Sequence, residues 1–562
     1  MEIEDSSEQD KLRNDGECKD DYVYKDPCWM LCSTRWRIAF SIFFSFALLY
    51  MHRVNLSLAV VCMVDATKSV QKPSHDNTAT EATYVTNSSE DTLMIVTNTA
   101  DVYHMSNTTA NIDSSDFTFN QQINAEPSCG DTSVQTDMTM AREINWNKAE
   151  ISFLLSSYFY GSFFTQIPAG TLADIYGGKH IITVNMALSG ACALMTPIFA
   201  RTNIILMFIV RIILGLAGGA MIPAGMSMIN KWSTPRERPI MIAFCGSGLF
   251  SGTVLTYLTS GLLCAYGFDN GWPSIFYLHG VVSLLFVVIW CCTAFSSPLV
   301  HPRVTEAERN HIQTCLGDPV QRKHQKPPWK DIFTSKPMWA SIAAHFCFNW
   351  SFFTVLINVP LFLKEVLKFE ITSNGVYSSL PYVFQIVASI CFSSLSEFII
   401  KKHPSFHLLV RRTFNTTSLF GVAACLVAAG YVTCESRYIA IILLCLSCVF
   451  GGVAYGGFFA NHAEYSGQYT GTTFGITNAA GVISSILSSM MVGLLTPNGE
   501  QEEWRQVFYL AAAVDVFGAI VFIICCDIHV QPWARNHDSI TINVEQPGIE
   551  NMPLNDSKKT AL

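Results

Sequence analysis

Charged residues are scarce in this chain of 562 residues, at 14% of the sequence, while half of the sequence is hydrophobic. A soluble globular protein usually carries about a quarter charged residues. No basic tract is dense enough for a nucleic-acid surface, so we expect no nucleic-acid partner. No pair of CxxC elements suggests zinc, and most of the nineteen cysteines lie in apolar stretches, where we expect them to pack as small hydrophobes. No nucleophile–base pattern is present either, so we expect no enzyme activity, no metal and no cofactor.

The apolar residues fall in blocks that are long enough to cross a bilayer, which takes about 20 residues as a helix. About twelve blocks qualify, at 37–64, 149–172, 181–200, 204–226, 240–264, 274–296, 338–363, 375–400, 409–433, 438–461, 471–495 and 505–527. The polar, acidic segment before the first block is not a cleavable signal peptide. The sequence therefore predicts an all-α, multi-pass protein of the lipid bilayer.

Basic residues in the short connections predict the orientation of the helices, because they favour the cytosolic side. Alternate connections are rich in lysine and arginine, with Lys364 and Lys368 as the main exception. Both termini are therefore expected in the cytosol. The expected units are a cytosolic tail (1–36), a six-helix bundle (37–296), a cytosolic linker (297–337), a second six-helix bundle (338–527) and a cytosolic tail (528–562).

The segment 65–147, between the first two apolar blocks, is expected outside the cell or in a lumen. It holds about twelve acidic and three basic residues and few large apolar ones, so it is expected to be disordered. It carries two acceptor sequons, at Asn87 and Asn107. We therefore expect N-glycosylation at both asparagines.

Residues 170–179, in the connection between the second and third apolar blocks, have the sequence GTLADIYGGK. It resembles the G-x-L-a-D-x-x-G-x-[KR] pattern of the major facilitator superfamily, in which small residues allow close helix approach and the aspartate helps to close a cytosolic gate. A weaker copy is expected in the second bundle. The candidate gate residues are Gly170, Asp174, Gly177, Gly178, Lys179, Arg236, Glu397, His462 and Glu464. The glycine-rich run 246–252 follows no strand, so it predicts helix packing and not a nucleotide loop.

Further stretches narrow the resemblance: RVNLS at 53–57, WSTPRER at 232–238, SSLPY at 378–382, FGITN at 474–478 and QPWA at 531–534. Together they resemble the anion-transporter family of sialin, the vesicular glutamate transporters and the type I sodium–phosphate cotransporters. The resemblance implies the major facilitator fold, about twelve helices in two halves, and transport of a small anionic substrate by alternating access.

Two arginines within apolar blocks are the first candidates for substrate binding, because charges in membrane helices are costly and usually functional. Arg53 lies in the first block and Arg211 in the fourth. A guanidinium binds carboxylate or phosphate through two parallel hydrogen bonds. In the resembled family, arginines at both positions are implicated in anion recognition. The alternatives are that Arg53 extends to the outer interface and that Arg211 links helices structurally.

Neutral and titratable candidates lie in the second bundle. His345 could hydrogen-bond substrate or titrate, although a buried packing histidine is the alternative. Tyr382 and Asn478 could donate hydrogen bonds to an anion, whereas His462 and Glu464 are expected at the cytosolic gate. No role follows from the sequence for Asp515, in the last block.

Departures from the resembled family bear on the coupling ion. The sialin and glutamate branches carry acidic residues where this chain has Leu214 and Gly218, and a glutamate-branch arginine is matched by Phe348. These absences weaken proton coupling and argue against glutamate. We therefore expect phosphate or an organic anion as substrate, driven by sodium or the membrane potential, with protons second. The alternatives are a proton-coupled, sialin-like transporter of lysosomes or vesicles, and a non-transporting receptor or scaffold.

The chain ends in Thr560-Ala561-Leu562, which fits the class I pattern of ligands for PDZ domains. A PDZ-domain partner is therefore a candidate. Such a partner, together with the lack of an acidic dileucine signal at Leu12, favours the plasma membrane over lysosomes or vesicles.

Overall fold

The computed structural model describes residues 33–64, 143–234, 237–316 and 327–535, except for the side chains of 167, 169–171, 174, 175, 239 and 468. Over these residues the chain forms twelve long helical segments: α3 (Thr34–Met63), α4 (Lys148–Tyr176), α5 (Gly178–Thr202), α6 with α7 (Ile204–Gly219, Met221–Trp232), α8 (Arg238–Tyr266), α9 (Trp272–Thr293), α12 (Lys336–Glu365), α13 (Ile371–Lys402), α14 (His407–Gly430), α15 with α16 (Arg437–Val453, Phe458–Ser466), α17 (Thr470–Leu495) and α18 (Gln501–Cys525). Eleven of these segments are long and apolar enough to cross a membrane, and α4 is the twelfth helix of the bundle. The predicted helical membrane protein is confirmed.

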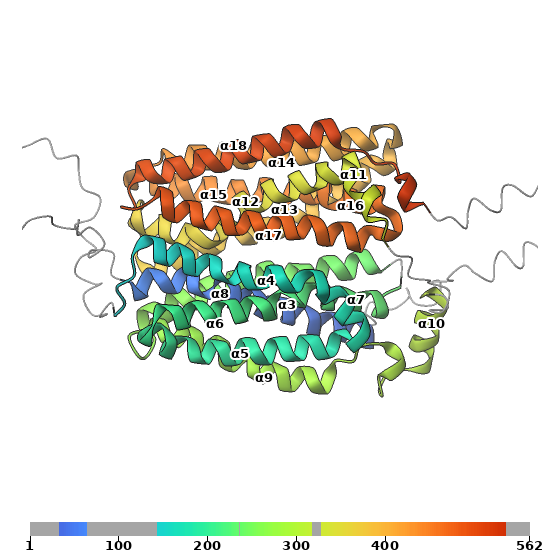
Figure 1. The fold of residues 1–562 in the computed structure, drawn as a ribbon, viewed down its shortest axis with the longest axis horizontal. Coiled ribbons are helices and arrows are strands. Elements are labelled where there is room, and N and C mark those ends of the chain that lie inside the picture. The colour runs from blue at the N-terminus through green and yellow to red at the C-terminus, as the bar shows by residue number, and fades with distance from the viewer. Residues whose placement is uncertain (1–32, 65–142, 235–236, 317–326, 536–562) are drawn as a thin grey trace, which may run out of the picture.

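The helices form two side-by-side halves, which Figure 1 shows as a blue-to-green layer (α3–α9) and a yellow-to-red layer (α12–α18). In the first half α3 packs on α8, α4 on α6 and α5 on α9. In the second half α12 packs on α17, α14 on α18 and α13 on α15. The pairs α8–α13 and α4–α17 join the halves. Two six-helix halves, as predicted, therefore meet along one interface.

The internal repeat is visible in two helix breaks. The fourth segment is interrupted after Gly218-Gly219, where α6 ends and α7 begins beyond Ala220. The tenth segment is interrupted after Gly451-Gly452, where a short 3₁₀ turn (Ala454–Gly456) separates α15 from α16. Because glycine weakens helix continuation, paired glycines at matching positions explain both breaks.

Glycines in α8 let it lie directly against α3, as the glycine-rich run predicts. A Cβ atom at Gly248 or Gly252 would overlap the backbone carbonyls of Phe43 and Ala47, respectively. Gly246 is different, since a Cβ atom there would meet nothing within 4 Å. Close helix packing therefore accounts for Gly248 and Gly252.

One end of the bundle, called the loop end here, is where α3 finishes and the chain returns at Glu143 before α4. Val64 and Ile144 form an isolated parallel bridge there. Arg201 holds both Glu143 and Asp269, at 2.9 and 2.8 Å. The hydrogen bonds from the Arg201 guanidinium hold the pKa of Asp269 below its usual value. The returning chain is thereby fixed to the first half.

A disulfide between Cys62 and Cys264 also lies at the loop end and joins α3 to α8. The expectation that cysteines act as small hydrophobes is therefore wrong for this pair. Both cysteines lie in the last turns of their helices. Because both have apolar sequence neighbours, like most other cysteines of the chain, the disulfide could not be predicted from the sequence.

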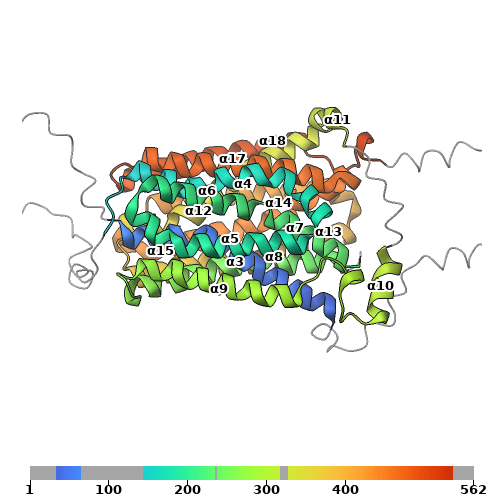
Figure 2. The same ribbon diagram turned by 60° about the horizontal axis from the view of Figure 1, so that its bottom comes forward.

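The opposite end of the bundle, called the linker end, carries the connection between the halves. Its first part, α10 (Glu306–Leu316), docks on the first half, where Glu308 accepts hydrogen bonds from the Ser33 hydroxyl (2.6 Å) and the Arg35 backbone N–H (3.0 Å). Glu308 thus caps the N-terminus of α3. The capping contact fixes α10 to this half, and Figure 2 shows α10 beside α3 and far from α11.

The last part of the linker, α11 (Trp329–Thr334), packs on the second half. Ile332 is fully buried in a cluster with Met338 and Tyr465. The Trp339 indole donates a hydrogen bond to the Phe333 carbonyl at 2.8 Å. Each end of the linker is therefore bound to a different half.

Candidate functional site

Arg53 lies where the two halves meet, with its side chain in a cage of aromatic rings. Its guanidinium carbon is 4.5 Å from the centre of the Phe353 ring and 4.7 Å from that of Phe159. The rings of Tyr50 and Tyr158 are each 5.2 Å away. Cation–π contacts of this kind attract the charge without neutralising it. Phe353 belongs to α12 and the other rings to α3 and α4, so the cage is built from both halves.

Arg211, from the middle of α6, points toward the backbone of α3. It donates hydrogen bonds to the carbonyls of His52 (3.1 Å) and Arg53 (3.3 Å) and to the Asn55 side chain (3.2 Å). The side chain is only 1% exposed. These bonds are a structural link between α6 and α3, and they hold the turn of α3 that carries Arg53. The structure therefore places Arg211 behind Arg53, as seen from the second half.

Tyr158 of α4 lies between the two arginines and was not among the residues predicted from the sequence. Its ring centre is 5.2 Å from the guanidinium carbon of Arg53 and 5.9 Å from that of Arg211. A side chain at Gly218 would overlap the Tyr158 hydroxyl. The tyrosine therefore occupies the space beside Gly218, between the two arginines.

No carboxylate pairs with Arg53 or Arg211 anywhere in the described ranges, and the Nε atom of each is buried without a hydrogen-bond partner. A buried charge without a counterion is unfavourable. The two guanidinium groups that share this condition both contact Tyr158, and together they form a positive centre in the core of the protein. An anion that reached this centre would supply both the missing charge and the missing acceptors.

His345 on α12 and His462 on α16 share one hydroxyl group, that of Thr477 on α17. The Thr477 oxygen is 3.0 Å from Nδ1 of His345 and 2.9 Å from Nε2 of His462. Nδ1 of His462 is 2.8 Å from the Phe458 carbonyl, which can only accept. A neutral His462 therefore carries its proton on Nδ1, which leaves Nε2 as an acceptor facing Thr477. The Thr477 hydroxyl has one proton and is also 3.0 Å from the Phe474 carbonyl, so these two acceptors compete for it. His462 is thus linked to His345 through Thr477, while its expected place at the cytosolic gate with Glu464 stays a prediction.

Tyr382 and Asn478, the two neutral candidates, lie apart from each other. The Tyr382 ring centre is 6.0 Å from that of Tyr257 on α8 and 6.5 Å from that of Phe352. Its hydroxyl is buried without a hydrogen-bond partner in the described ranges. Asn478 is half-buried on α17, next to Thr477. The structure therefore brings Arg53 together with Arg211 and His345 together with His462, but it does not gather all the candidates into one cluster.

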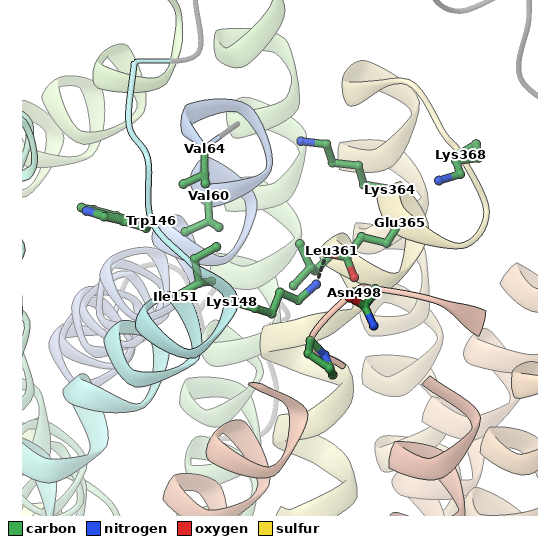
Figure 3. A pocket seen from close by; sticks show the side chains of 12 residues that line it. Val60, Val64, Trp146, Lys148, Ile151, Leu361, Lys364, Glu365, Lys368 and Asn498 are labelled. Atoms are coloured by element: carbon green, nitrogen blue, oxygen red, sulfur yellow. Dashed lines mark hydrogen bonds and ion pairs between the residues drawn. The ribbon is translucent and has the colours of Figure 1, made fainter. Parts of the chain in front are cut away.

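At the loop end the two halves are closed against each other around a cavity of about 180 Å³ (Figure 3). Lys148 of α4 forms an ion pair with Glu365 of α12 across the interface. Glu365 also accepts a hydrogen bond from the Trp504 indole at 2.9 Å. Lys364 donates to the Val61 carbonyl of α3. This second contact accounts for one lysine that departs from the expected charge pattern, since Lys364 acts as a closing contact between the halves.

The described hydrogen bonds that cross between the halves all lie in the part of the bundle nearer the loop end. Ser57 donates to the Ile357 carbonyl, and Tyr257 donates to the Leu356 carbonyl. The structure is therefore a state that is closed at the loop end.

The signature loop at the linker end is described in part. Gly177 has φ of 82° and precedes α5, and a Cβ atom at Gly178 would lie 2.5 Å from Met228. Lys179 donates to the Cys291 carbonyl at 3.0 Å. The side chains of Gly170 and Asp174 lie outside the described residues, as does Arg236 as a whole.

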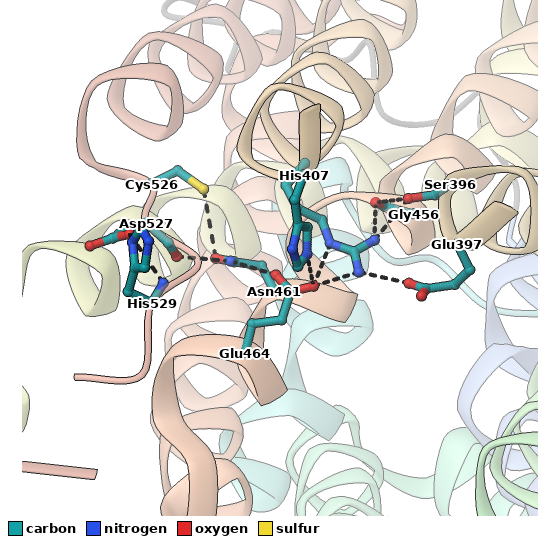
Figure 4. Close-up of polar contacts among 10 residues, drawn as sticks. Ser396, Glu397, His407, Gly456, Asn461, Glu464, Cys526, Asp527 and His529 are labelled. Carbon is teal, nitrogen blue, oxygen red and sulfur yellow. Dashed lines mark hydrogen bonds and ion pairs between the residues drawn. The ribbon is translucent and has the colours of Figure 1, made fainter. Parts of the chain in front are cut away.

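In the second half, Arg411 of α14 is the centre of a polar network at the linker end, and Figure 4 labels its partners Ser396, Glu397 and Glu464. It forms ion pairs with Glu397 at 2.6 Å and with Glu464 at 2.5 Å. His407 lies 2.7 Å from Glu464, and Arg411 also donates to the Ser396 hydroxyl at 2.8 Å. Glu397 and Glu464 thus join α13, α14 and α16 within one half. Sequence reasoning missed Arg411 as a site residue, although it was visible as a charge near the start of the apolar block 409–433.

Comparison with known proteins agrees with this architecture. Residues 132–489 match the Major Facilitator Superfamily. Human sialin is 30% identical over 94% of this chain and 98% of its own length, and a putative inorganic phosphate cotransporter of Drosophila ananassae is 32% identical over 71% and 81%. A solved bacterial homologue of the human lysosomal transporter Spinster, in an inward-facing conformation, has a TM-score of 0.61 at 12% identity, over 88% of this chain and 97% of that one. The chain therefore belongs to the major facilitator superfamily, within the transporter family of sialin, the vesicular glutamate transporters and the inorganic phosphate cotransporters.

Proposed function

We propose that this protein is a secondary active transporter that carries anions, either inorganic phosphate or organic carboxylates, across a membrane by alternating access. The observation that carries the proposal is the pair of buried guanidinium groups, Arg53 and Arg211, without a carboxylate partner in the described ranges. Relatives named for sialin and for inorganic phosphate cotransport support an anionic substrate. Family members are transporters, so we propose no catalytic reaction.

Alternating access requires two gates that close in turn. We propose that Lys148, Glu365 and Lys364 close the loop-end gate and that Asp174 and Glu397 stabilise the states of the linker-end gate. With the loop end facing the outside or a lumen, as the basic residues predict, the described state is closed on that side of the membrane. Arg53 would then bind the anion at the interface, while Arg211 would hold Arg53 in place and add positive potential.

The driving force is proposed to be a sodium gradient or the membrane potential. Leu214 and Gly218 stand where a titratable carboxylate would be needed for the proton mechanism of the resembled branches. We further propose the plasma membrane as the location, glycosylation at Asn87 and Asn107, and a PDZ-domain partner for the C-terminus. Asn87, Asn107 and the C-terminal residues all lie outside the described residues.

Uptake of radiolabelled phosphate and organic anions into proteoliposomes tests the proposal, with sodium, proton and voltage gradients imposed separately. Arg53→Lys and Arg211→Lys should each weaken apparent affinity about ten- to a hundredfold, because a lost charged hydrogen bond is worth about 1.5–3 kcal/mol. Arg437→Lys is the matched control, since Arg437 stacks on the Phe369 ring at the loop end, with 4.9 Å between guanidinium carbon and ring centre. Affinities equal to the wild type in both arginine variants would refute the assigned role. Absence of accumulation under every gradient would favour a receptor or scaffold.

A proton-coupled, sialin-like transporter is the second candidate, and the shared hydroxyl of Thr477 between His345 and His462 favours it, because two histidines in contact can exchange a proton. Uptake that vanishes when the proton gradient is collapsed, at fixed voltage and without sodium, would select this candidate over sodium or potential coupling.

A further inference from the structure

Asp515, for which the sequence suggested no role, lies in the interior of the second half. It is fully buried on α18, and the Ser351 hydroxyl of α12 donates a hydrogen bond to its Oδ2 atom at 2.6 Å. Its Oδ1 atom is buried and has no partner in the described part of the chain. An ionised carboxylate in such a place costs a large free energy unless a positive group accompanies it. The position therefore requires either a bound proton or a bound cation.

A small cavity of about 20 Å³ adjoins Asp515 and supplies further oxygen atoms. Most of its walls are apolar, from Phe348, Phe352, Val355, Leu419 and Val422, and its oxygen-bearing side chains are those of Ser351, Gln385 of α13, Ser447 of α15 and Asp515. Gln385 is 1% exposed, and its Oε1 atom is buried without a partner. A cavity of at least about 10–15 Å³ holds a single water molecule or an ion of similar size. Four helices thus bring two unsatisfied acceptor oxygens and two hydroxyls to a space for one small guest.

The donor set selects the kind of guest. Oxygen ligands suit hard cations, whereas a site for zinc or another softer metal would use several histidines or cysteines. Cys448 is the one such residue in the lining of this cavity. The described residues hold no group of three His, Cys, Asp or Glu that could bind a metal ion. The cavity contains one carboxylate and no basic side chain in its lining, so its charge matches a monovalent cation and not a divalent one.

We propose that Asp515, Ser351, Gln385 and Ser447 form a sodium site in the second half of the transporter. The proposal rests on the proposed anion transport, because it names the cation that would be coupled to it. The sodium ion neutralises the carboxylate and satisfies Oδ1 of Asp515 and Oε1 of Gln385. The two serines contribute hydroxyl oxygens.

The site also touches the interface between the halves through aromatic rings. Phe352 follows Ser351 on α12 and lines the same cavity. Its ring centre is 6.3 Å from that of Phe250 on α8, in the first half. It also lies next to Phe353, a wall of the Arg53 cage, with ring centres 5.0 Å apart. An ion that fixes this turn of α12 therefore acts on residues at the anion centre and at the half–half contact.

Thermal unfolding of the purified full-length protein in detergent, without substrate, tests sodium binding separately from transport. Sodium chloride should raise the melting temperature in a saturable manner, whereas potassium or choline chloride at equal ionic strength should not. Asp515→Asn should abolish the sodium effect. Ser351→Ala, which retains the carboxylate, should raise the half-saturating sodium concentration about tenfold for the loss of one ligand of about 1.4 kcal/mol. Glu502→Gln is the control, because Glu502 is a 79% exposed carboxylate on the same helix.

Equal stabilisation by potassium, or full retention of the sodium effect in both Asp515→Asn and Ser351→Ala, would overturn the site. Stabilisation that follows pH and ignores sodium would overturn it in favour of a protonated Asp515. If Asp515→Asn does not fold, the half-saturating sodium concentration of Ser351→Ala decides: a rise supports the site, and an unchanged value overturns it. Sodium stabilisation without anion uptake would refute the proposed function and leave the site standing. Anion uptake at equal rates in sodium and choline, in a protein whose melting temperature does not rise with sodium, would refute the sodium site and leave the proposed function standing.

Discussion

The ion pair between Lys148 and Glu365 provides the sharpest test of how the loop end closes. The side chains of the two residues are 12% and 14% exposed, so water screens the pair only in part. A hydrogen bond between charged groups is worth about 1.5–3 kcal/mol. Partial screening favours the lower figure, and each 1.4 kcal/mol is about a factor of ten in an equilibrium. Lys148→Gln should therefore shift the equilibrium about tenfold toward the state that is open at the loop end.

Hydrogen–deuterium exchange followed by mass spectrometry measures this shift in lipid nanodiscs, without labels. Peptides that cover the first turns of α4 and the last turns of α12 should exchange faster in Lys148→Gln, because exchange reports the free energy of local opening. The double variant Lys148→Glu with Glu365→Lys restores an ion pair of reversed direction. Its protection should return in part only, because a lysine at 365 cannot accept the hydrogen bond that the Trp504 indole donates at 2.9 Å.

Glu502→Gln is the control, since Glu502 makes only an i,i+3 pair within α18 and is 79% exposed. Unchanged exchange at the loop end in Lys148→Gln, or an equal change in Glu502→Gln, would refute the role of the pair as a closing contact.

Three further outcomes are expected. Gly252→Ala should lower the melting temperature, because the added methyl group meets the backbone of α3 and overpacking costs about 1–3 kcal/mol; an unchanged melting temperature would mean that α3 and α8 separate freely. Glycosidase should lower the apparent mass on gels, and Asn87→Gln with Asn107→Gln should abolish that shift; no shift in glycosylation-competent cells would reverse the predicted orientation. A C-terminal peptide should bind PDZ domains at micromolar concentration and lose binding in Leu562→Asp, and binding that survives would mean that another part of the tail is recognised.

The sequence predicted the helices well because membrane helices need long apolar blocks, and such blocks are visible without knowledge of tertiary contacts. Arg53 and Arg211 were found for a similar reason, since a charge within an apolar block stands out. In both of these cases the signal and its cause lie within one stretch of chain. The breaks beside the paired glycines at 218–219 and 451–452 were not predicted, since both fall inside apolar blocks that were expected to be continuous.

The contacts of the candidate site could not be predicted, because they depend on residues far apart in the chain. Lys148 and Glu365 are separated by 217 positions, and neither stands out among other charged residues near helix ends. Arg211 uses backbone carbonyls as acceptors, and these leave no trace in a sequence. The position of Tyr158 beside Gly218 emerges only when α4 packs on α6. Asp515 was visible as a buried charge, but its neighbours Ser351 and Gln385 were not distinguishable from other polar residues in apolar blocks.

The two docked ends of the linker have a consequence for how the protein could be divided. The contact of Glu308 with the start of α3 makes α10 part of the first half, and the burial of Ile332 makes α11 part of the second. The two anchored ends, α10 up to Leu316 and α11 from Trp329, therefore belong to different halves. A break in the polypeptide between Leu316 and Trp329 leaves the Glu308 cap of α3 on the first fragment and the buried Ile332 on the second. The chain is thus suited to co-expression as two complementary fragments that reassemble in the membrane, with each anchor already on the fragment that it stabilises.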